Sequence, residues 1–506
     1  MSAEADAQAS PPRHEVWIDS AGCSATEVRA LMHSVLAAGI PATATRLVVD
    51  SIAHEDTAEL LAAAAGEGVP TMDAQSDELN ARLSVTAASD LVVLRGGRVV
   101  PEAFDRIAGF LDRFPRISVA YGDSIADRGA ALLRPLFSPI RLFGNDYLGP
   151  VVAFRIEMLR RIGGFRPDAR RAQVLDLVLR AERAGESIAL LPQELATEDL
   201  AHGDFAGTSD AQHRVVVDEL DARGVRAQVE DVEPFLRRIR FAVEGDPLVS
   251  VVIPTRGSSA EIGGAERVLV VEAVRGVIEQ STYRNVEVVV VADAETPAGV
   301  VEELERLCGD RLRLVAWNAP FNFSGKMNRG AAAARGEYLL LLNDDVEIVS
   351  PDWIETMLGL AQRDGVGIVG AQLYFEDSTL QHSGQVYTGG VAGHAAFGWE
   401  GGRDDPIRSL AVDHEVSGVT AACAIVRRDL FLEVGGFSLA FPGNYNDVDL
   451  NMKIRATGRS AVFSPWARLY HFESKTRDPK ILDTDISTLQ ARWARRMQIE
   501  LYSRML

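Results

Sequence analysis

The chain has 506 residues, more than one ordinary domain holds, which predicts about two or three folded units. Hydrophobic residues make up 47% of it and charged residues 25%, a balance typical of globular proteins, and the net charge of −20 disfavours nucleic acid, whose phosphates need a basic surface. The three cysteines lie far apart, which argues against a disulfide framework or a structural zinc site and favours a reducing compartment.

Residues 1–13 are small and polar and have no apolar stretch of the kind found in signal peptides, so we expect a disordered leader. The apolar runs that follow are much shorter than the ~20 residues that span a bilayer. We therefore predict a cytoplasmic protein without a transmembrane segment. The sequence leaves open a peripheral contact with the inner face of the membrane, and it leaves open the oligomeric state.

Residues 14–200 are expected to form a first α/β unit, because short apolar runs alternate there with helical patterns, as in a mostly parallel sheet covered by helices. The expected strands lie at 47–50, 91–94 and 117–120, and the expected helices at 27–38 and 102–113. Residues 201–247 are more polar, and we interpret them as a connector with one helix at 211–223.

A second α/β unit is predicted over residues 248–480, followed by a terminal helix over 481–506. Its first strand, 248–253, stops at a turn of Pro254, Thr255, Arg256 and Gly257. Further strands are expected at 286–291, 312–315 and 337–342, and helices at 268–280 and 328–334.

The two halves carry a weak internal repeat. Residues 154–165 parallel residues 426–437, both segments end in Gly-Gly-Phe, and a helix follows each of them. Earlier in each half, residues 90–94 match residues 337–342. Two matched segments in the same order predict a tandem duplication of one fold.

Asp344 and Asp345 directly follow the apolar strand at 337–342. Strands of open α/β sheets end at the crevice where ligands bind, and two carboxylates there form an oxygen site suited to magnesium or manganese. Such an ion can neutralise the charge of a departing nucleotide diphosphate. The alternative is a solvated acidic loop before the helix at 351–362.

Asn446, Asp447 and Asp449 open another expected helix. A carboxylate at a helix start is often an N-cap, and either aspartate can serve as one. The functional interpretation makes Asp447 a general base that takes the proton of an acceptor hydroxyl.

Three histidines are further candidates. His471 follows an expected strand at 460–463 and can bind a metal through its neutral imidazole, although a structural role is the commoner one. His382 and His394 flank a glycine-rich stretch that suits either a loop folding over a ligand or a plain surface loop. Asp293 ends another strand and is either a nucleoside contact or a turn residue.

The sequence lacks the glycine-rich dinucleotide fingerprint, the phosphate-loop lysine motif, the nucleophile-elbow serine motif and zinc-ligand spacing. These absences weaken dehydrogenase, kinase and hydrolase interpretations.

Taken together, the ordered segments resemble family 2 glycosyltransferases of the GT-A fold, particularly the rhamnosyltransferase-like bacterial members. The resemblance covers about 230 residues, and the ordered set is more specific than any one motif. The matching segments are 249–255, 321–324, 328–331, 336–345, 351–353, 381–384, 434–437, 446–449 and 471–474.

The resemblance implies an inverting transfer of a sugar from a nucleotide-diphospho-sugar, a UDP- or dTDP-sugar, to the hydroxyl of a carbohydrate or lipid-linked acceptor. The expected setting is the synthesis of a cell-envelope polysaccharide or glycolipid. Asp447 is then the catalytic base, and Asp345 with His471 holds the manganese or magnesium ion. The implied donor-binding residues are Pro254, Thr255, Arg256, Asp293, Lys326, Asn328 and Asp344. The implied acceptor-side residues are Asn446, Asp449, His382 and His394.

The first half resembles the same fold with its chemistry removed. Residues 95–98, Arg-Gly-Gly-Arg, stand where the acidic pair is expected, and Gln173, Val174 and Leu175 stand where the base is expected. A cationic turn repels a divalent metal, so we predict a non-catalytic GT-A-like domain.

Two rival functions are a sugar nucleotidyltransferase, which can share this fold and its metal, and a non-catalytic scaffold of a polysaccharide-assembly complex. The ending with Asp447 and His471 favours glycosyl transfer over the first. The joint retention of Asp345, Asp447 and His471 argues against the second.

Overall fold

The computed structural model describes residues 12–21, 23–50, 57–126, 128–198, 208–472 and 481–504. The chain divides into two compact units, one ending at Arg237 and the other running from Arg238 to Arg504. In the described residues, no helix combines the length and the apolar character needed to cross a membrane. Most of the predicted leader, residues 1–11, lies outside the described residues.

The first unit is built on one large sheet with strand order β3-β2-β1-β4-β8-β6-β9-β5. Its strands are β1 (His14–Asp19), β2 (Thr45–Val49), β3 (Thr71–Asp73), β4 (Asp90–Leu94), β5 (Arg98–Val99), β6 (Ile117–Ala126), β7 (Ala131–Leu132), β8 (Val151–Arg155) and β9 (Ser187–Glu198). Its helices are α1 (Ala25–Ala37), α2 (Thr57–Gly66), α3 (Ser76–Val85), α4 (Ala103–Arg113), α5 (Pro139–Gly144), α6 (Ile156–Arg161) and α7 (Gln173–Arg183). Helix α4 is amphipathic and buries Phe104, Ile107 and Leu111 from one face, as a helix that covers a sheet must.

The predicted connector contains more structure than one helix. It holds α8 (Thr208–Ala222), followed by the hairpin of β10 (Ala227–Glu233) and β11 (Leu236–Phe241).

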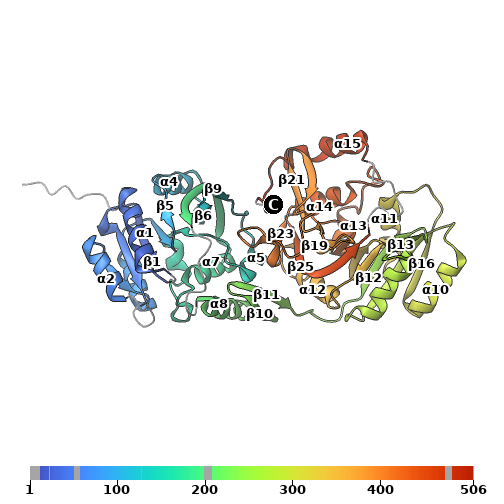
Figure 1. Ribbon diagram of the computed structural model, residues 1–506, viewed down its shortest axis with the longest axis horizontal. Helices are drawn as coiled ribbons and strands as arrows, with labels where there is room; N and C mark the ends of the chain where they lie inside the picture. The colour runs from blue at the N-terminus through green and yellow to red at the C-terminus, as the bar shows by residue number, and fades with distance from the viewer. Residues whose placement is uncertain are drawn as a thin grey trace, which may run out of the picture. The chain divides into compact units, whose positions relative to one another are not determined.

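The second unit has a sheet of order β16-β15-β12-β17-β24-β19-β25-β18. Its strands are β12 (Val249–Thr255), β13 (Ser259–Ile262), β14 (Ala265–Val268), β15 (Val286–Asp293), β16 (Leu312–Trp317), β17 (Tyr338–Leu342), β18 (Val346–Ile348), β19 (Val366–Tyr374), β20 (Leu380–His382), β21 (Gln385–Thr388), β22 (Val391–His394), β23 (His414–Val416), β24 (Cys423–Arg427) and β25 (Ser460–His471). Its helices are α9 (Leu269–Arg275), α10 (Ala298–Cys308), α11 (Phe323–Ala333), α12 (Trp353–Ala361), α13 (Arg428–Glu433), α14 (Asn446–Ala456) and α15 (Asp483–Trp493). In each unit the strands gather in the middle with helices around them (Figure 1).

The central strands are apolar on both faces because helices cover both. Every residue of β12 and of β17 is buried. Helix α11 packs on β12 and β15, whereas α12 packs on β19 and β25. Such continuous apolar strands are typical of parallel sheets covered on both sides.

The two sheets share one topology. Strands β1, β2, β3 and β4 pair in parallel, as do β12, β15, β16 and β17. In both units the next strand, β8 or β24, runs antiparallel to its two neighbours, and a parallel pair follows, β6 with β9 or β19 with β25. The α/β fold in tandem, which the internal repeat predicts, is therefore confirmed.

Three predicted elements differ from the structure. The strand expected at 460–463 is β25, which continues to His471. The terminal helix α15 ends at Trp493 instead of continuing to residue 506, because the chain beyond it pairs with the turn between β21 and β22. The amides of Gly389 and Gly390 donate to the carbonyls of Gln498 and Met497. The third difference is in α11, which starts at Phe323 rather than at residue 328, because the Asn322 side chain caps it by accepting from the Gly325 amide.

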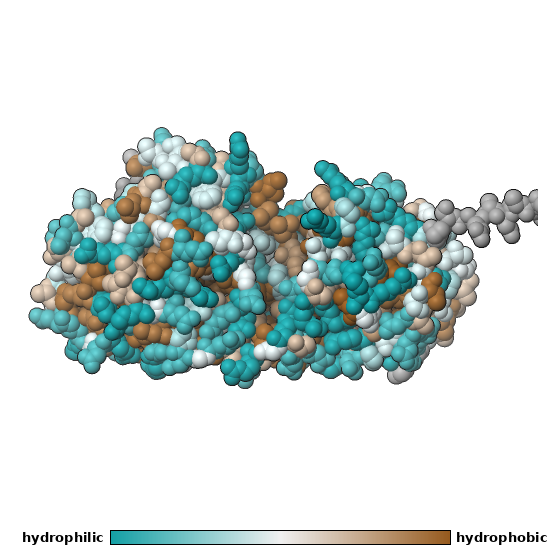
Figure 2. Space-filling view, turned by 180° about the vertical axis from the view of Figure 1, so that it is seen from behind, coloured by the Kyte–Doolittle hydropathy of each residue, from teal (hydrophilic) through white to brown (hydrophobic). Residues whose placement is uncertain are grey.

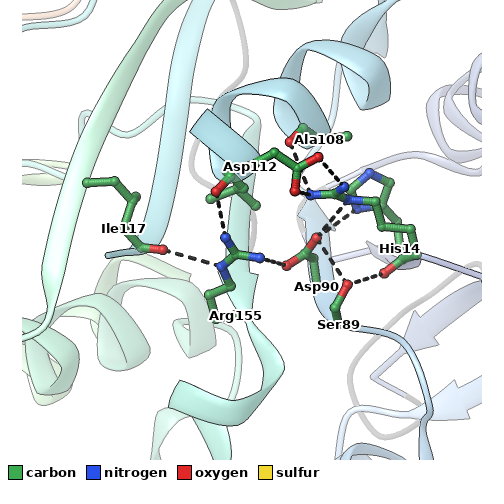
Figure 3. A network of polar contacts seen from close by, with 9 residues as sticks. His14, Ser89, Asp90, Ala108, Asp112, Ile117 and Arg155 are labelled. Carbon is green, nitrogen blue, oxygen red and sulfur yellow. Dashed lines mark hydrogen bonds and ion pairs between the residues drawn. The ribbon is translucent and has the colours of Figure 1, made fainter. Parts of the chain in front are cut away.

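The described residues already include Arg13, the last residue of the predicted leader. Its guanidinium contacts Asp90 at 3.3 Å and Asp112 at 2.7 Å. Arg155 contacts the other oxygen of Asp90 at 3.0 Å (Figure 3). The Asp90 carboxylate is fully buried, so these ion pairs hold the start of the unit in place. On the face shown in Figure 2, hydrophilic side chains alternate with small apolar groups.

Candidate active site

A cavity of about 610 Å³ opens in the second unit, where β12 and β17 end. Its walls come from segments that span more than 200 residues of the sequence, as expected for a crevice at the carboxyl ends of parallel strands. The predicted site residues that line it are Pro254, Thr255, Arg256, Lys326, Asp344, Asp345, His382, His394, Asn446, Asp447 and His471.

One side of the cavity is organised by Thr255 and Lys326. The Thr255 hydroxyl accepts from the Gly257 amide at 2.9 Å and donates to Asp344 at 2.6 Å. Lys326, whose side chain is 1% exposed, donates to the Thr255 carbonyl at 2.7 Å and to Asp293 at 2.8 Å. Asp293 does not itself line the cavity, and Lys326 connects it to the residues that do.

The two adjacent aspartates occupy different environments. Burial, reinforced by the neighbouring Asp345 charge, raises the pKa of Asp344 to about 6, although the Thr255 hydroxyl opposes the shift. Asp345 instead faces His471, with 3.1 Å between Oδ1 and the imidazole Nε2. The strand register explains this contact, because Val346 of β18 pairs with His471 of β25.

The His471 ring is held in one tautomer. Its Nδ1 lies 2.6 Å from Gln381 Oε1, which only accepts, so Nδ1 carries the proton. The lone pair is therefore on Nε2, where the Asn343 amide donates to it at 3.0 Å.

This pair fits a divalent cation. A carboxylate oxygen and an imidazole lone pair face each other across 3.1 Å, and a glutamine orients the imidazole from the far side, as in many metal sites. Within the described ranges, no group of three or more histidine, cysteine, aspartate or glutamate side chains is arranged to hold a metal. An ion bound by Asp345 and His471 would need phosphate or water oxygens to complete its shell, which is how magnesium sites in phosphate-handling enzymes are built.

Asp447 lies in the first turn of α14 and faces the cavity. The N-cap of this helix is Tyr445, which has a left-handed backbone with φ of 56°, so Asp447 is not the cap. Burial raises the pKa of the Asp447 carboxyl, while the nearby His394 and hydrogen bonds with Thr420 and the Ala421 amide oppose the rise. A raised pKa makes a carboxylate a better proton acceptor. Asn446 next to it is buried and donates to the Gly443 carbonyl at 3.2 Å.

Asp449 and Asn328 do not line the cavity. Asp449 is fully buried and accepts from Trp493 at 2.9 Å and Arg492 at 2.9 Å, which fastens α15 to α14. Asn328 uses its amide group to accept from and donate to the Phe437 backbone, both at 2.8 Å. These placements do not support the donor-side contact expected of Asn328 or the acceptor-side contact expected of Asp449.

The first unit repeats the contact of Asn328 and an ion pair that Asp449 makes within its own helix. Asn80 accepts from the Phe165 amide at 2.8 Å and donates to its carbonyl at 2.9 Å, as Asn328 does with Phe437. Asp176 pairs with Arg180 four residues on, as Asp449 pairs with Lys453. Because these contacts occur in both units, they belong to the fold and not to chemistry in one of them.

The chemical residues, by contrast, have no equivalents among the described residues of the first unit. Arg98 pairs with Thr197 as Val346 pairs with His471, so Gly97 and Thr197 stand where Asp345 and His471 stand in the second unit. A side chain at Gly97 would meet the Thr197 carbonyl oxygen at 2.1 Å. Arg95 forms a buried ion pair with Asp146.

Sequence reasoning assigned no role to several residues of the cavity. Gln381 and Asn343 fix the His471 ring, and Thr420 contacts Asp447. Phe321 and Phe397 line the cavity although they are 48% and 57% exposed. Aromatic side chains so exposed are unusual, but only the folded structure reveals the exposure.

Comparison with known proteins finds a family match in the second unit. Residues 250–435, which lie within the second unit, match the model of glycosyl transferase family 2. The chain is 32% identical over 430 residues to the uncharacterized protein y4gI of Sinorhizobium fredii, covering 79% of this chain and 46% of that protein. It is also 32% identical over 391 residues to the O-antigen biosynthesis protein RfbC of Myxococcus xanthus, covering 74% of this chain and 30% of that one. The chain thus spans less than half the length of these relatives.

Solved structures similar to the chain include GalNAc-T7 with UDP, GalNAc and Mn²⁺, at a TM-score of 0.37 and 14% identity, covering 48% of this chain and 47% of that one. Another is the mannosyltransferase PcManGT from Pyrobaculum calidifontis with GDP-Man and Mn²⁺, at a TM-score of 0.33 and 16% identity, covering 49% of this chain and 69% of that one.

Proposed function

We propose that the second unit is an inverting, metal-dependent glycosyltransferase. It moves a sugar from a UDP- or dTDP-sugar to a hydroxyl of a carbohydrate or lipid-linked acceptor. The family match over residues 250–435 supports transfer of a sugar, and the similarity to a protein named for O-antigen biosynthesis supports a role in cell-envelope polysaccharide or glycolipid synthesis. We further propose that it works in the cytoplasm, with or without contact to the inner face of the membrane.

The observation that carries this proposal is that the two chemical functions share one cavity. Asp345 and His471 form the cation-binding pair, and Asp447 lines the same 610 Å³ space with its pKa raised. A cavity of this size matches those that enclose small molecules. A sugar nucleotidyltransferase needs the metal but no base for an acceptor hydroxyl, so Asp447 favours transfer of a sugar.

The residues divide the reaction among them. Asp345 and His471 would hold the manganese or magnesium ion, which would supply positive charge where the diphosphate leaves. Asp447 takes the proton of the acceptor hydroxyl, and the hydroxyl oxygen forms a bond to the anomeric carbon. At the same time the bond from that carbon to the diphosphate breaks, and its electron pair goes to the diphosphate oxygen. Attack opposite to the leaving group inverts the anomeric configuration. Lys326 holds Asp293 and the Thr255 carbonyl at the side we assign to the nucleoside.

The first unit is proposed to be a non-catalytic domain. In the part of it that the structure describes, the acidic pair, the histidine and the base are missing at the positions that correspond to Asp345, His471 and Asp447. Its equivalents are Gly97, Thr197 and Val174.

Thermal unfolding tests the binding step. The midpoint for the full chain is measured with UDP, dTDP or GDP, each with manganese and again with EDTA. We expect one uridine or thymidine diphosphate to raise the midpoint only when manganese is present, because a ligand that binds the native state stabilises it. Equal stabilisation with EDTA would contradict the metal-dependent donor site.

A substitution tests the chemistry. With the donor identified in this way, Asp447→Asn should retain nucleotide binding and lower transfer by about 10²- to 10⁴-fold, the contribution typical of a general base. Transfer near the wild-type rate would show that Asp447 is not the base. Binding without turnover in the wild-type protein would favour a scaffold.

A further inference from the structure

The hairpin of β21 and β22 brings a buried polar pair to the cavity. Gln385 of β21 lines the cavity and is 2% exposed, and Tyr387, two residues further on, is 1% exposed. The Tyr387 hydroxyl lies 2.6 Å from Gln385 Oε1. A Cβ added at Gly418 would clash with both of these oxygens, so the pair is fitted against bare backbone.

The hydrogen bond of this pair runs from the hydroxyl to the carboxamide oxygen. Burial, reinforced by the nearby Asp447 charge, raises the pKa of Tyr387 well above its usual value, so the phenol keeps its proton and needs an acceptor. A separation of 2.6 Å is normal for an O–H···O bond and short for an N–H···O bond. The pair of Gln372 and Tyr374 on β19 has the opposite polarity, since Gln372 Nε2 donates to the Tyr374 hydroxyl at 2.9 Å. Gln385 is therefore held with its oxygen toward Tyr387.

This orientation leaves the amide nitrogen of Gln385 without a protein partner. None of the residues that the structure describes accepts a hydrogen bond from Gln385 Nε2, although the side chain is almost fully buried. Buried polar groups are nearly always hydrogen-bonded. Because Gln385 lines the cavity, the acceptor that its nitrogen lacks is supplied from within the cavity.

Gln385 and the proposed base are held by one framework. The backbone N–H of Gln385 donates to the Gly418 carbonyl at 2.7 Å. The next residue, Val419, is tied to the base by Asn451, whose amide donates to the carbonyls of Val419 and Asp447, both at 2.7 Å. The unpaired donor and the base therefore line the cavity in a fixed relation to each other.

The hairpin is anchored by the segment that follows α15. Glu500 Oε2 accepts from the backbone N–H of Tyr387 at 2.6 Å. The turn amides of Gly389 and Gly390 donate to carbonyls of the same segment. These bonds fix the hairpin at a strand and at its turn, which keeps Gln385 at the cavity wall.

The first unit serves as an internal comparison. Among its described residues, α5 and not a hairpin lies between β7 and β8. The hairpin that carries Gln385 thus occurs in the unit that keeps the acidic pair and the base.

Resting on the proposed function, we propose that Gln385 is a sugar-binding residue that donates from Nε2 to a sugar oxygen beside Asp447, with Tyr387 as the positioning residue that fixes its amide. Sugars are the parts of both substrates that meet at the base, because Asp447 takes the acceptor proton where the anomeric carbon is attacked. Sugar oxygens are neutral acceptors that suit an amide N–H, whereas the charged diphosphate is assigned to the cation at Asp345 and His471. The oxygen belongs to the transferred sugar or to the acceptor sugar, and binding measurements distinguish the two.

Calorimetric titration of the full chain tests the contact. Wild type, Gln385→Leu and the control Gln372→Leu are titrated in the presence of manganese with UDP, dTDP, UDP-glucose, UDP-galactose and dTDP-rhamnose. They are also titrated, with manganese and the nucleotide diphosphate present, with the methyl glycosides of rhamnose, glucose and galactose. Gln385→Leu should weaken binding of a sugar ligand about three- to tenfold, the effect of one lost neutral hydrogen bond, and leave binding of the bare nucleotide diphosphate unchanged. A loss seen with the nucleotide-sugar assigns the oxygen to the transferred sugar, and a loss seen with the glycoside assigns it to the acceptor.

The control Gln372→Leu should bind every ligand like the wild type, because its glutamine–tyrosine pair lies outside the cavity lining. Tyr387→Phe should weaken sugar binding less than Gln385→Leu does, because the amide can still present its N–H in one of two orientations.

A double variant separates binding from folding. Gln385→Leu leaves the buried Tyr387 hydroxyl without its acceptor and should lower the midpoint of urea unfolding. Gln385→Leu combined with Tyr387→Phe removes both polar partners and should recover most of that loss. The double variant should nevertheless bind the sugar as weakly as Gln385→Leu does.

Sugar affinities equal to wild type in Gln385→Leu and in the double variant would overturn the contact. Equal losses for the sugar ligand and for the bare nucleotide diphosphate would also overturn it, because they would indicate a structural role. If the wild type binds sugars through Gln385 but transfers none, the proposed function fails and the contact stands. If the wild type binds none of these sugars, the contact fails, while manganese-dependent binding of the nucleotide diphosphate still decides the donor site.

Discussion

Replacing Gln381 with leucine removes the hydrogen-bond acceptor that holds the His471 ring. In the native protein, Gln381 Oε1 accepts from His471 Nδ1 at 2.6 Å, which leaves the Nε2 lone pair directed at Asp345, 3.1 Å away. Gln381 is 4% exposed and His471 7%, so water does not readily take over the lost bond. Without it the ring can rotate or adopt the other tautomer, and neither presents the lone pair beside Asp345.

The expected magnitude comes from the role of such partners in metal sites. Mutating the group that orients a histidine ligand typically weakens metal binding about 10- to 100-fold, because the ligand must be reoriented each time the ion binds. We expect Gln381→Leu to weaken manganese binding by this factor in the presence of UDP or dTDP.

The assay is titration of the full chain with Mn²⁺, followed by the electron paramagnetic resonance signal of the free ion. Gln372→Leu is the matched control, because Gln372 is similarly buried, lies on β19 and bonds to the Tyr374 hydroxyl at 2.9 Å, outside the cavity lining. It should bind manganese like the wild type. Unchanged affinity in Gln381→Leu, or equal loss in both variants, would refute the reasoning.

Three further substitutions separate chemistry from structure. Burial raises the pKa of Asp344 to about 6 from its unfolded value near 3.8, so ionising this carboxyl destabilises the folded protein increasingly between these two pH values. Metal-free Asp344→Asn should therefore be more stable than wild type above pH 6, by about 1–3 kcal/mol in urea unfolding, and the difference should vanish near pH 4. A stability difference that does not change with pH would contradict this. Gly97→Ala should destabilise the protein by at least about 2 kcal/mol, because φ is +70° and the new Cβ meets Thr197. The control Gly39→Ala has a similar φ of +86° but no atom within 4 Å of the new Cβ, so it should destabilise the protein by about 1 kcal/mol. Equal losses of stability in the two variants would rule out the steric explanation. Asn328→Ala should lower stability by about 1–3 kcal/mol, because its hydrogen bonds to Phe437 are lost, and should leave nucleotide affinity unchanged. A loss of nucleotide affinity without a loss of stability would show instead that Asn328 contacts the donor.

Local sequence patterns predicted the parts of the site that lie next to secondary structure. Asp344 and Asp345 follow a strand whose residues are all apolar, and Asp447 opens a helix, so each could be placed from its immediate neighbours. The tandem fold was predictable because the repeated Gly-Gly-Phe segments keep their order, and the sheets confirm it.

Contacts between distant segments could not be predicted in this way. Gln381 orients His471 from 90 residues away, and the strand register that brings Val346 beside His471 depends on the whole sheet. The terminal helix was predicted too long because the chain after it hydrogen bonds to Gly389 and Gly390, and helix propensity carries no information about such tertiary contacts. Asn328 could not be assigned from the sequence, because a residue that the fold needs recurs as regularly as one that chemistry needs. Only its counterpart Asn80 in the other unit separates the two.

Anomalous diffraction from crystals of the full chain soaked with MnCl₂ and the stabilising nucleotide diphosphate tests the central claim most directly. The account predicts one strong manganese peak in the cavity, within bonding distance of Asp345 and His471 Nε2 and of the diphosphate oxygens. Nucleotide bound in the cavity with Asp345 and His471 both lacking contact with a metal would contradict it.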